Sequence, residues 1–261
     1  MKFLKKSLGQ NLLVDKNIIK KILNLINFKD RNVIEIGPGK GALTDEIIKK
    51  GPKTLTLIEK DTELVKFLKN KYNLKKKIKV INNDILKFNF DIINKKKVIV
   101  IGNLPYNISS QILIKIIKYN SLKNKFDDLI FMFQKELGDK IIGKFPSKNY
   151  GRLSIIANLR LNIIKKFLVS ANCFFPKPKV TSMVIQFKPI KKNYYNFKDI
   201  SNLEKITNLV FSNRRKIIRK RINKILNQKA LSQIPELNLN LRPEEISPKI
   251  FYKITELYEK S

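Results

Sequence analysis

Short apolar runs alternate with amphipathic stretches through the first two thirds of the chain. The apolar runs have the length of strands and lie at residues 33–37, 54–58, 78–81, 97–101 and 128–133. Stretches with apolar residues at helical spacing lie at residues 16–25, 42–49, 62–70, 109–119 and 153–159. This alternation predicts a parallel sheet with helices on both of its faces.

The pattern changes after residue 160. Two apolar segments, 163–169 and 181–187, flank a Pro-Lys-Pro turn at 176–178 and predict a terminal antiparallel pair in a mostly parallel seven-stranded α/β sheet. After Pro189 no strand pattern remains, and from Asp199 onward the spacing is helical. We therefore expect a sheet domain at 1–188, a linker at 189–198 and a small all-helical domain at 199–261.

A glycine-rich loop follows the first of these strands. Residues 32–44 read NVIEIGPGKGALT, with glycines at 37, 39 and 41 ahead of a helix. Glycine permits a sharp turn and lets a ligand approach backbone N–H groups, which predicts a nucleotide-type site. Gly37, Gly39 and Ala42 also satisfy the dinucleotide pattern G-x-G-x-x-G/A, so the loop alone does not separate a nicotinamide cofactor from S-adenosylmethionine.

Carboxylates end the next two strands. Glu59 stands 22 positions after Gly37, where a carboxylate accepts hydrogen bonds from ribose hydroxyls. Asp84 follows the third strand and is placed either to accept from an adenine amino group or to serve as a turn or helix N-cap residue. The carboxyl ends of parallel strands meet at one edge, so a ligand lying along that edge would meet all of these groups.

The tetrad Asn103-Leu104-Pro105-Tyr106 follows the fourth apolar run. Pro105 fixes its own φ and holds Leu104 extended, so the Asn103 side chain and a neighbouring carbonyl become convergent acceptors. Tyr106 adds a face for stacking. The tetrad predicts a pocket for a planar base with an exocyclic amine; the alternative is a strand followed by an ordinary turn.

The net charge of +34 and the pI near 10.1 favour a polyanionic partner. Only eight of the 55 basic residues are Arg, and Lys, Asn and Ile share A/T-rich codons. Runs such as 75–77 and 95–97 are therefore typical of solvated faces.

Arginine is concentrated in the segment FSNRRKIIRKRINKIL, residues 211–226. Phe211, Ile218, Ile222 and Ile225 recur at helical spacing and predict a helix docked by an apolar stripe. Its other faces would present cations suited to phosphates. The alternative is a face that only increases solubility.

Several chemistries are excluded by composition. The chain has no His, which rules out His general bases, His-containing catalytic triads and His-ligated metals. The single cysteine, Cys173, rules out an internal disulfide and a Cys₄ zinc site, so we expect no metal. The N-terminus lacks a signal-like apolar stretch, and no uncharged run is suited to spanning a membrane, so we expect a soluble cytoplasmic protein.

Eight segments in one order carry a family resemblance. They are KKSLGQNLL, VIEIGPGKGALT, the Glu59 and Asp84 positions, GNLPYNIS, FMFQKE, YGRLSI, FFPKPKVTS and FSNRRKIIRKRI. Together they make the chain resemble the ribosomal RNA adenine dimethyltransferases, and within them the small-subunit (16S) enzymes that dimethylate two adjacent adenosines. Leu12, where an aromatic is usual, and Thr181, where Asp is common, depart from the family pattern.

The resemblance implies a Rossmann-like class I methyltransferase fold, S-adenosylmethionine as methyl donor, and small-subunit rRNA within a pre-ribosomal small subunit as partner. The oligomeric state is left open by the sequence, with a monomer as the default expectation. It implies that Asn11 and Leu13 cover the cofactor, that the Gly37 and Gly39 loop holds its methionine end, and that Glu59, Asp84 and Asn103 bind it. It places Phe174 near the target base, with core packing as the alternative. The implied RNA-binding residues are Arg214, Arg215, Lys216, Arg219, Lys220 and Arg221.

Three other functions remain open. A nicotinamide dehydrogenase would use the glycine loop and Glu59 but leave the tetrad and the charge without a role. A non-catalytic RNA-binding assembly factor is the second. The third is a large-subunit rRNA adenine methyltransferase of the antibiotic-resistance type.

Overall fold

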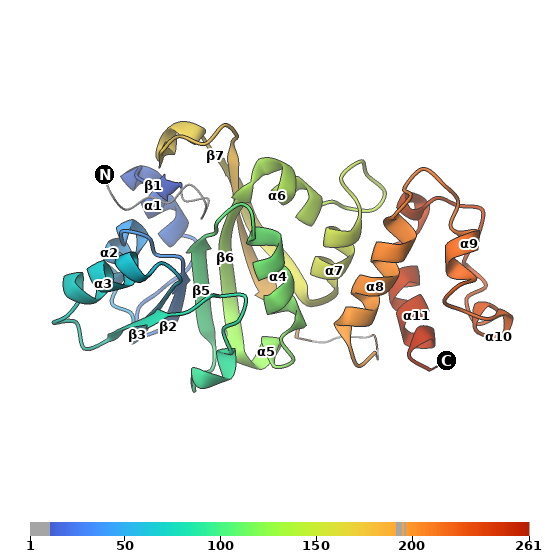
Figure 1. Ribbon diagram of the computed structural model, residues 1–261, viewed down its shortest axis with the longest axis horizontal. Helices are drawn as coiled ribbons and strands as arrows, with labels where there is room; N and C mark the ends of the chain where they lie inside the picture. Colours follow the sequence, from blue (N-terminus) through green and yellow to red (C-terminus); the bar gives the residue numbers. More distant parts are fainter. Residues whose placement is uncertain (1–10, 192–194, 196, 261) are drawn as a thin grey trace. The chain divides into compact units, whose positions relative to one another are not determined.

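A seven-stranded sheet in the order β4-β3-β2-β5-β6-β9-β7 is the centre of the first part of the chain (Figure 1). Strands β2 to β6 pair in parallel, and β9 pairs antiparallel to β6. The strands are β2 (Asn32–Ile36), β3 (Thr54–Glu59), β4 (Ile78–Asn82), β5 (Val98–Asn103), β6 (Phe126–Gln134), β7 (Leu161–Val169) and β9 (Ser182–Pro189). The predicted mostly parallel sheet with two later strands at its end is confirmed.

The strands form where apolar residues are continuous. Residues 98–101 of β5 are all 1% exposed or less, as expected for a parallel strand covered on both faces. At β6, residues 128–133 are likewise buried. Burial on both sides therefore fixes the centre of the sheet, and the strand ends at its carboxyl edge carry the polar residues.

Helices cover the sheet in the predicted alternation. Helices α1, α2 and α3 share one apolar cluster with Val33, Leu55 and Leu57, so they lie on the same face. Figure 1 shows α4 on the other side of β5 and β6. The helices of this part are α1 (Lys16–Leu23), α2 (Ala42–Lys49), α3 (Thr62–Lys71), α4 (Ser109–Lys118), α5 (Leu122–Lys125) and α6 (Lys135–Ile141), with the 3₁₀ turns η2 (Phe90–Ile92) and η3 (Ala171–Cys173).

The computed structural model describes residues 11–191, 195 and 197–260. Residues 5–10 of the segment KKSLGQNLL, and residues 192–194 and 196 of the expected linker, lie outside the described residues. A pairing that the sequence did not suggest joins β1 (Leu12–Leu13) to β8 (Phe174–Phe175) in an antiparallel two-stranded sheet. It ties the start of the described chain to the segment before β9.

The chain divides into two compact units, residues 1–138 with 162–189, and residues 139–161 with 190–261. The sequence analysis placed 139–161 in the sheet domain, whereas these residues cluster with the C-terminal helices. Two buried tyrosines tie them there, since Tyr150 donates to the carbonyl of Ile246 at 2.8 Å and Tyr252 donates to the carbonyl of Ile155 at 2.7 Å.

The regular elements among the described residues of the second unit are helices and 3₁₀ turns joined by loops, and only Leu161 at the start of β7 belongs to a strand. Its elements are α7 (Arg152–Arg160), α8 (Ile200–Phe211), α9 (Arg219–Ile222), α10 (Gln228–Leu231), the 3₁₀ turn η4 (Pro243–Glu245) and α11 (Pro248–Tyr258). In the described part of the chain, no helix is both long enough and apolar enough to span a membrane.

The prediction of one helix across residues 211–226 is wrong. Helix α8 ends at Phe211, and only the four residues of α9 are helical again. The N–H groups of Ile218 and Arg219 donate to the carbonyls of Leu241 and Leu239, which draws the backbone away from the line of α8. Of the four residues in the predicted apolar stripe, Ile218 and Ile222 are fully buried, whereas Phe211 and Ile225 are only partly buried.

One carboxyl group lies inside the core of the first unit. Glu35 in β2 is 2% exposed, and the Thr44 hydroxyl donates to its Oε2 at 2.6 Å. Burial raises the pKa of Glu35 to about 8, and the Thr44 hydrogen bond opposes that shift. Between the unfolded value near 4.5 and a folded value near 8, the folded chain keeps a proton that the unfolded chain releases. The free energy of unfolding should therefore fall as pH rises through this window.

We predict that Glu35→Gln removes this pH dependence, because an amide has no proton to lose. Denaturant unfolding at pH 5.5 and 8.5 should show the wild type losing about 2 kcal/mol or more relative to the variant. The exposed substitution Glu63→Gln is the control and should leave the wild-type loss unchanged. Equal pH dependence in wild type and Glu35→Gln would contradict the prediction.

Candidate active site

The glycine loop connects β2 to α2 through left-handed backbone. Gly37, Gly39 and Gly41 have φ angles of 65°, 58° and 82°. A Cβ on Gly39 would lie 2.8 Å from the Leu12 side chain, and one on Gly41 would lie 2.3 Å from the Tyr72 hydroxyl. The loop therefore requires glycine for its conformation and for the close approach of its neighbours.

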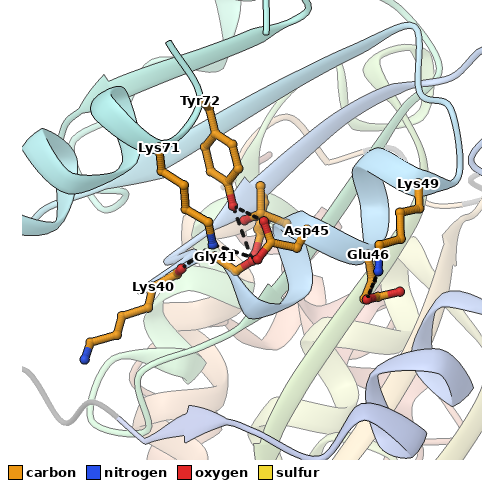
Figure 2. A network of polar contacts seen from close by, with 9 residues as sticks. Lys40, Gly41, Asp45, Glu46, Lys49, Lys71 and Tyr72 are labelled. Atoms are coloured by element: carbon orange, nitrogen blue, oxygen red, sulfur yellow. Dashed lines mark hydrogen bonds and ion pairs between the residues drawn. The ribbon is translucent and has the colours of Figure 1, made fainter. Parts of the chain in front are cut away.

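The end of α3 holds this loop in place, as Figure 2 shows. Asp45 in the first turn of α2 accepts from the Tyr72 hydroxyl at 2.8 Å and from Lys71 Nζ at 2.6 Å. Lys71 also donates to the carbonyl of Lys40 at 3.2 Å. These contacts fix the loop before any ligand arrives, which lowers the ordering cost of binding.

Glu59 ends β3 as a buried acceptor. Its Oε1 accepts from the N–H groups of Lys60 at 2.9 Å and Asp61 at 3.0 Å, while Oε2 accepts from Gly39 N at 3.3 Å. Burial raises the pKa of Glu59, and the three N–H donors oppose that shift. The carboxylate thus links the β3 turn to the glycine loop, and the long contact at Oε2 leaves acceptor capacity for a ligand hydroxyl.

Asp84 follows β4 and makes a turn contact, one of the two roles weighed from the sequence, while its contact with an adenine amino group stays a prediction. Its Oδ1 accepts from the N–H of Leu86 at 2.9 Å, which is a turn contact, and Oδ2 accepts from Lys60 Nζ at 2.8 Å. The Lys60 hydrogen bond is the main reason why the pKa of Asp84 is lowered. Asp84 is therefore ionised near neutral pH, and each oxygen retains a further lone pair for an amino group.

Asn103 stands at the end of β5 with its amide orientation determined by a neighbour. Its Nδ2 donates to the backbone carbonyl of Asn11 at 2.7 Å. A carbonyl oxygen only accepts, so the amide nitrogen must face Asn11 and the side-chain oxygen must face away from it. Oδ1 is left as an acceptor.

Tyr106, the aromatic residue of the tetrad, is also held in place by a hydrogen bond. The Tyr106 hydroxyl and the hydroxyl of Ser182 at the start of β9 lie 2.5 Å apart. Ser182 is fully buried, whereas Tyr106 is partly exposed. Burial raises the pKa of Tyr106, so the phenol stays protonated at neutral pH. A fixed hydroxyl restricts the tilt of the ring.

These groups line one cavity of about 210 Å³ at the carboxyl edge of the sheet. Its walls include most of the predicted site: Asn11, Gly37, Gly39, Glu59, Asp84, Asn103, Leu104, Pro105 and Tyr106. A second cavity of about 280 Å³ shares Leu12, Gly37 and Asn103 with the first and is also lined by Leu13 and Glu35. Two adjoining spaces therefore meet at Asn103 and the glycine loop.

Phe174 does not line either of these two cavities. It is 3% exposed, pairs with Leu13 in the β1–β8 sheet, and belongs to the apolar cluster beneath α1 to α3. Its neighbour Phe175 is 46% exposed. A role for Phe174 near the target base stays a prediction, and its burial gives that role no support.

The six basic residues predicted to bind RNA are of two kinds. Arg214 makes its contacts inside the second unit. It pairs with Glu244 at 2.6 Å and donates to the carbonyls of Lys148 and Tyr150, each at 3.0 Å. Arg219 donates to Asn240 Oδ1 and Arg221 to the carbonyl of Ile217. Three further cations are exposed and have no side-chain partner among the described residues: Arg215, Lys216 and Lys220.

Three polar residues near the cavities were missed from the sequence. Glu35 carried a signal, since a carboxylate inside an apolar strand next to a glycine loop is unusual. Lys60 and Ser182 carried none, because their partners Asp84 and Tyr106 are distant in the chain. Within the described residues, no group of three His, Cys, Asp or Glu side chains gathers as a metal site would require.

The sequence profile described as "Ribosomal RNA adenine dimethylase" matches residues 1–260. A Ribosomal RNA small subunit methyltransferase A from Pelagibacter ubique (strain HTCC1062) is 44% identical over 256 residues, covering 98% of this chain and 97% of that protein. The protein of the same name from Buchnera aphidicola subsp. Baizongia pistaciae (strain Bp) is 43% identical over 252 residues, covering 95% and 94%.

Two crystal structures share the fold. A dimethyladenosine transferase from Plasmodium falciparum superposes with a TM-score of 0.78 at 23% identity, covering 93% of this chain and 95% of that chain. A 23S rRNA methyltransferase superposes with a TM-score of 0.69 at 20% identity, covering 95% and 100%. The predicted Rossmann-like class I methyltransferase fold is thereby confirmed. Since the profile and the relatives span nearly the full sequence, this chain belongs to the ribosomal RNA adenine dimethylase family.

Proposed function

We propose that this enzyme transfers methyl groups from S-adenosylmethionine to N6 of two adjacent adenosines near the 3′ end of small-subunit (16S) rRNA. The observation that carries the proposal is the orientation of the Asn103 amide, whose oxygen is free to accept at the point where the two cavities meet. The relatives that match over nearly the whole chain are named as small-subunit methyltransferases. We further propose that the protein acts as a cytoplasmic monomer on a small-subunit precursor.

The residues of the smaller cavity fit an adenosine-containing cofactor. Glu59 supplies a carboxylate for two ribose hydroxyls, and Asp84 supplies one for an adenine amino group. The glycine loop offers backbone next to the larger cavity, where the methionine end would lie. Asn11 and Leu13 border the two spaces from the N-terminal side. Bound S-adenosylmethionine supplies a methyl group made electrophilic by the adjacent sulfonium.

The protein's own task is to make a poor nucleophile react. The lone pair of adenine N6 is delocalised into the ring, so the amine must be drawn toward tetrahedral geometry. Asn103 Oδ1 would accept one N6 hydrogen and the Leu104 carbonyl the other, while the carbonyls of Pro105 and Tyr106 accept from Ile108 and Ser109. Fixed acceptors of this kind need no reorganisation during the reaction.

No strong base is required. The methylated amine is cationic until it loses a proton, and it is acidic enough to release that proton to water. A chain without His is therefore adequate for this chemistry. The second methylation needs one remaining N6 hydrogen to find an acceptor, so the base must rotate between turnovers while Tyr106 stacks on it.

The exposed cations of the second unit are our candidates for rRNA phosphate contacts. Arg215, Lys216 and Lys220 have no competing side-chain partner among the described residues. Arg219 and Arg221 each use one guanidinium nitrogen within the unit and retain other donors. Arg214 is held by three internal acceptors, so we assign it a structural part in the same surface.

Methyl transfer to separated ribosomal subunits tests the function. Tritiated S-adenosylmethionine should label unmethylated small subunits, and digestion should yield N6,N6-dimethyladenosine. Label only in large subunits would favour the resistance-type activity. No label in either subunit, with RNA still bound, would favour a non-catalytic assembly factor.

Asn103→Ala should lower the turnover number by about 10²–10³, because one of two preorganised acceptors is lost. The cofactor dissociation constant should stay within a few-fold when measured by calorimetry. Asn107→Ala, which changes another amide at the same cavity, is the control and should keep near-normal turnover. A fully active Asn103→Ala enzyme would refute the acceptor role.

Glu59→Ala should weaken cofactor binding by about 10- to 100-fold, because hydrogen bonds to a charged acceptor contribute roughly 1.5–3 kcal/mol. Calorimetric titration with S-adenosylhomocysteine measures the change, and the thermal midpoint checks that the glycine loop stays folded. Glu63→Ala on the exposed first turn of α3 should bind normally. Unchanged affinity in Glu59→Ala would remove this residue from the ribose site.

Ser182→Ala should lower turnover about fivefold, a loss of roughly 1 kcal/mol for one hydrogen bond, while cofactor affinity is unchanged. The double variant with Tyr106→Phe should be no worse than Tyr106→Phe alone, because both changes remove the same contact. Ser182→Thr, which restores a hydroxyl, should recover part of the activity. If the losses of turnover in the two single variants added up in the double variant, Ser182 would act through a contact other than its hydrogen bond with Tyr106.

A further inference from the structure

One face of the sheet is open where a parallel sheet is normally covered. Strand β3 is an interior strand, paired in parallel with both β2 and β4. Leu55 and Leu57 are fully buried against the α1–α3 cluster, whereas Thr54 and Thr56 on the opposite face are only partly buried. An interior strand with a polar, half-exposed face is a position where something outside the unit can bind.

The connection between β4 and β5 explains why this face is open. Residues 83–97 contain only the short turn η2 and no α-helix. The Phe90 ring in η2 packs edge-on against Phe126 at 5.2 Å and Tyr119 at 5.8 Å. The connection is therefore anchored toward β6 and α4, and the face of β3 and β4 is left uncovered.

A groove of about 530 Å³ lies on this face. Its lining includes Ile34 and Thr56, which are register partners, and Ile81, which lies on the same face two residues after Lys79, the partner of Thr56 in β4. Lysines from three separate segments border it: Lys53, Lys76, Lys77, Lys79 and Lys95. Among the described residues that line the groove there is no Asp or Glu.

Two carboxylates near the groove residues in the sequence already have partners. Asp91 accepts from the Tyr119 hydroxyl, and Asp127 pairs with Arg31. The lysine-rich composition alone would spread cations over every surface. What distinguishes this groove is that five lysines meet at a concave, otherwise uncovered sheet face with no acidic residue in its lining.

We infer that this groove, defined by Lys53, Lys76, Lys77, Lys79 and Lys95, binds the phosphodiester backbone of an RNA strand. The inference rests on the proposed function, since it concerns a second contact with the same RNA substrate. Lysines match phosphates, and the side-chain amide nitrogens of Asn32 and Asn94 offer donors for phosphate or ribose, while Asn32 Oδ1 accepts from the Thr54 hydroxyl at 2.8 Å. The described lining contains no aromatic ring, so bases have nothing to stack on and recognition is independent of sequence.

The groove and the cofactor cavity lie on the same face of the sheet. The groove is lined by Ile34 and Thr56, and the cavity by Ile36 and Ile58, each two residues further along its strand. Two residues of a strand span about 6.6 Å. The groove is also lined by the first residues of β2 to β5, which are Asn32, Thr54, Ile78 and Val98. An RNA strand in the groove therefore lies toward the amino ends of these strands, whereas the cofactor cavity and Asn103 lie at their carboxyl ends.

A matched pair of triple variants tests the groove. The groove variant carries Lys53→Gln, Lys79→Gln and Lys95→Gln, and the control carries Lys49→Gln, Lys66→Gln and Lys69→Gln on α2 and α3. Both remove three exposed positive charges from the first unit. The probe is an RNA fragment of the small-subunit 3′ region, with its dissociation constant measured by filter binding from 50 to 200 mM KCl.

The slope of log affinity against log salt should become shallower by about 2 for the groove variant, since each phosphate contact contributes roughly 0.7–0.9. Affinity should fall about tenfold at 0.1 M KCl, while the control changes less than twofold. Cofactor affinity should be unchanged in both. Methyl transfer at saturating RNA should also be unchanged, because the groove holds no reacting atom.

Equal slopes for the groove and control variants would overturn the inference, because the lysines would then contribute only general charge. It would also be overturned if the groove variant lost binding of ATP or pyrophosphate while binding RNA normally, since the site would then serve a small phosphate ligand. The proposed function has its own test, because it would be refuted if the wild-type enzyme methylated neither ribosomal subunit. That result would leave the comparison of RNA binding by the two triple variants unaffected, so failure of the function and failure of the groove are distinguishable.

Discussion

The hydrogen bond from Asn103 Nδ2 to the Asn11 carbonyl is the interaction on which the site depends. At 2.7 Å it orients a side chain whose two ends look alike in shape but differ in chemistry. It leaves the oxygen as the available acceptor, and it ties the carboxyl end of β5 to the N-terminal segment. The β1–β8 pairing holds that segment in place, so the orientation of one amide rests on contacts among three distant parts of the chain.

Further acceptors lie near this amide at the carboxyl edge of the sheet, and their order along the edge suits the proposed S-adenosylmethionine and target adenosine. Glu59 and Asp84 are carboxylates with partly used lone pairs, whereas Asn103 is neutral. A neutral acceptor suits an amine that gains positive charge during reaction and must then lose a proton. The buried carboxyl of Glu35, with a pKa of about 8, also limits the negative charge beneath the glycine loop.

Local patterns were sufficient to predict the strands, the main helices and most of the residues that line the 210 Å³ cavity, because several of these residues follow strands and parallel strands end at one edge. Long-range contacts were not predictable. Nothing near Ser182 indicates Tyr106, and nothing in the apolar spacing of 211–226 reveals that Ile218 and Arg219 bond to residues 239–241. Phe174 illustrates the same limit, since an aromatic residue before a proline turn has the same local signature in a core or in a pocket.

A crystal structure of the protein with S-adenosylhomocysteine and an adenosine-containing oligonucleotide would test the acceptor role of Asn103 directly. We expect the target N6 to lie about 3 Å from Asn103 Oδ1, while Nδ2 still donates to the Asn11 carbonyl. An Asn103 side chain turned away from N6, or an amide released from Asn11 with its nitrogen facing the base, would contradict it.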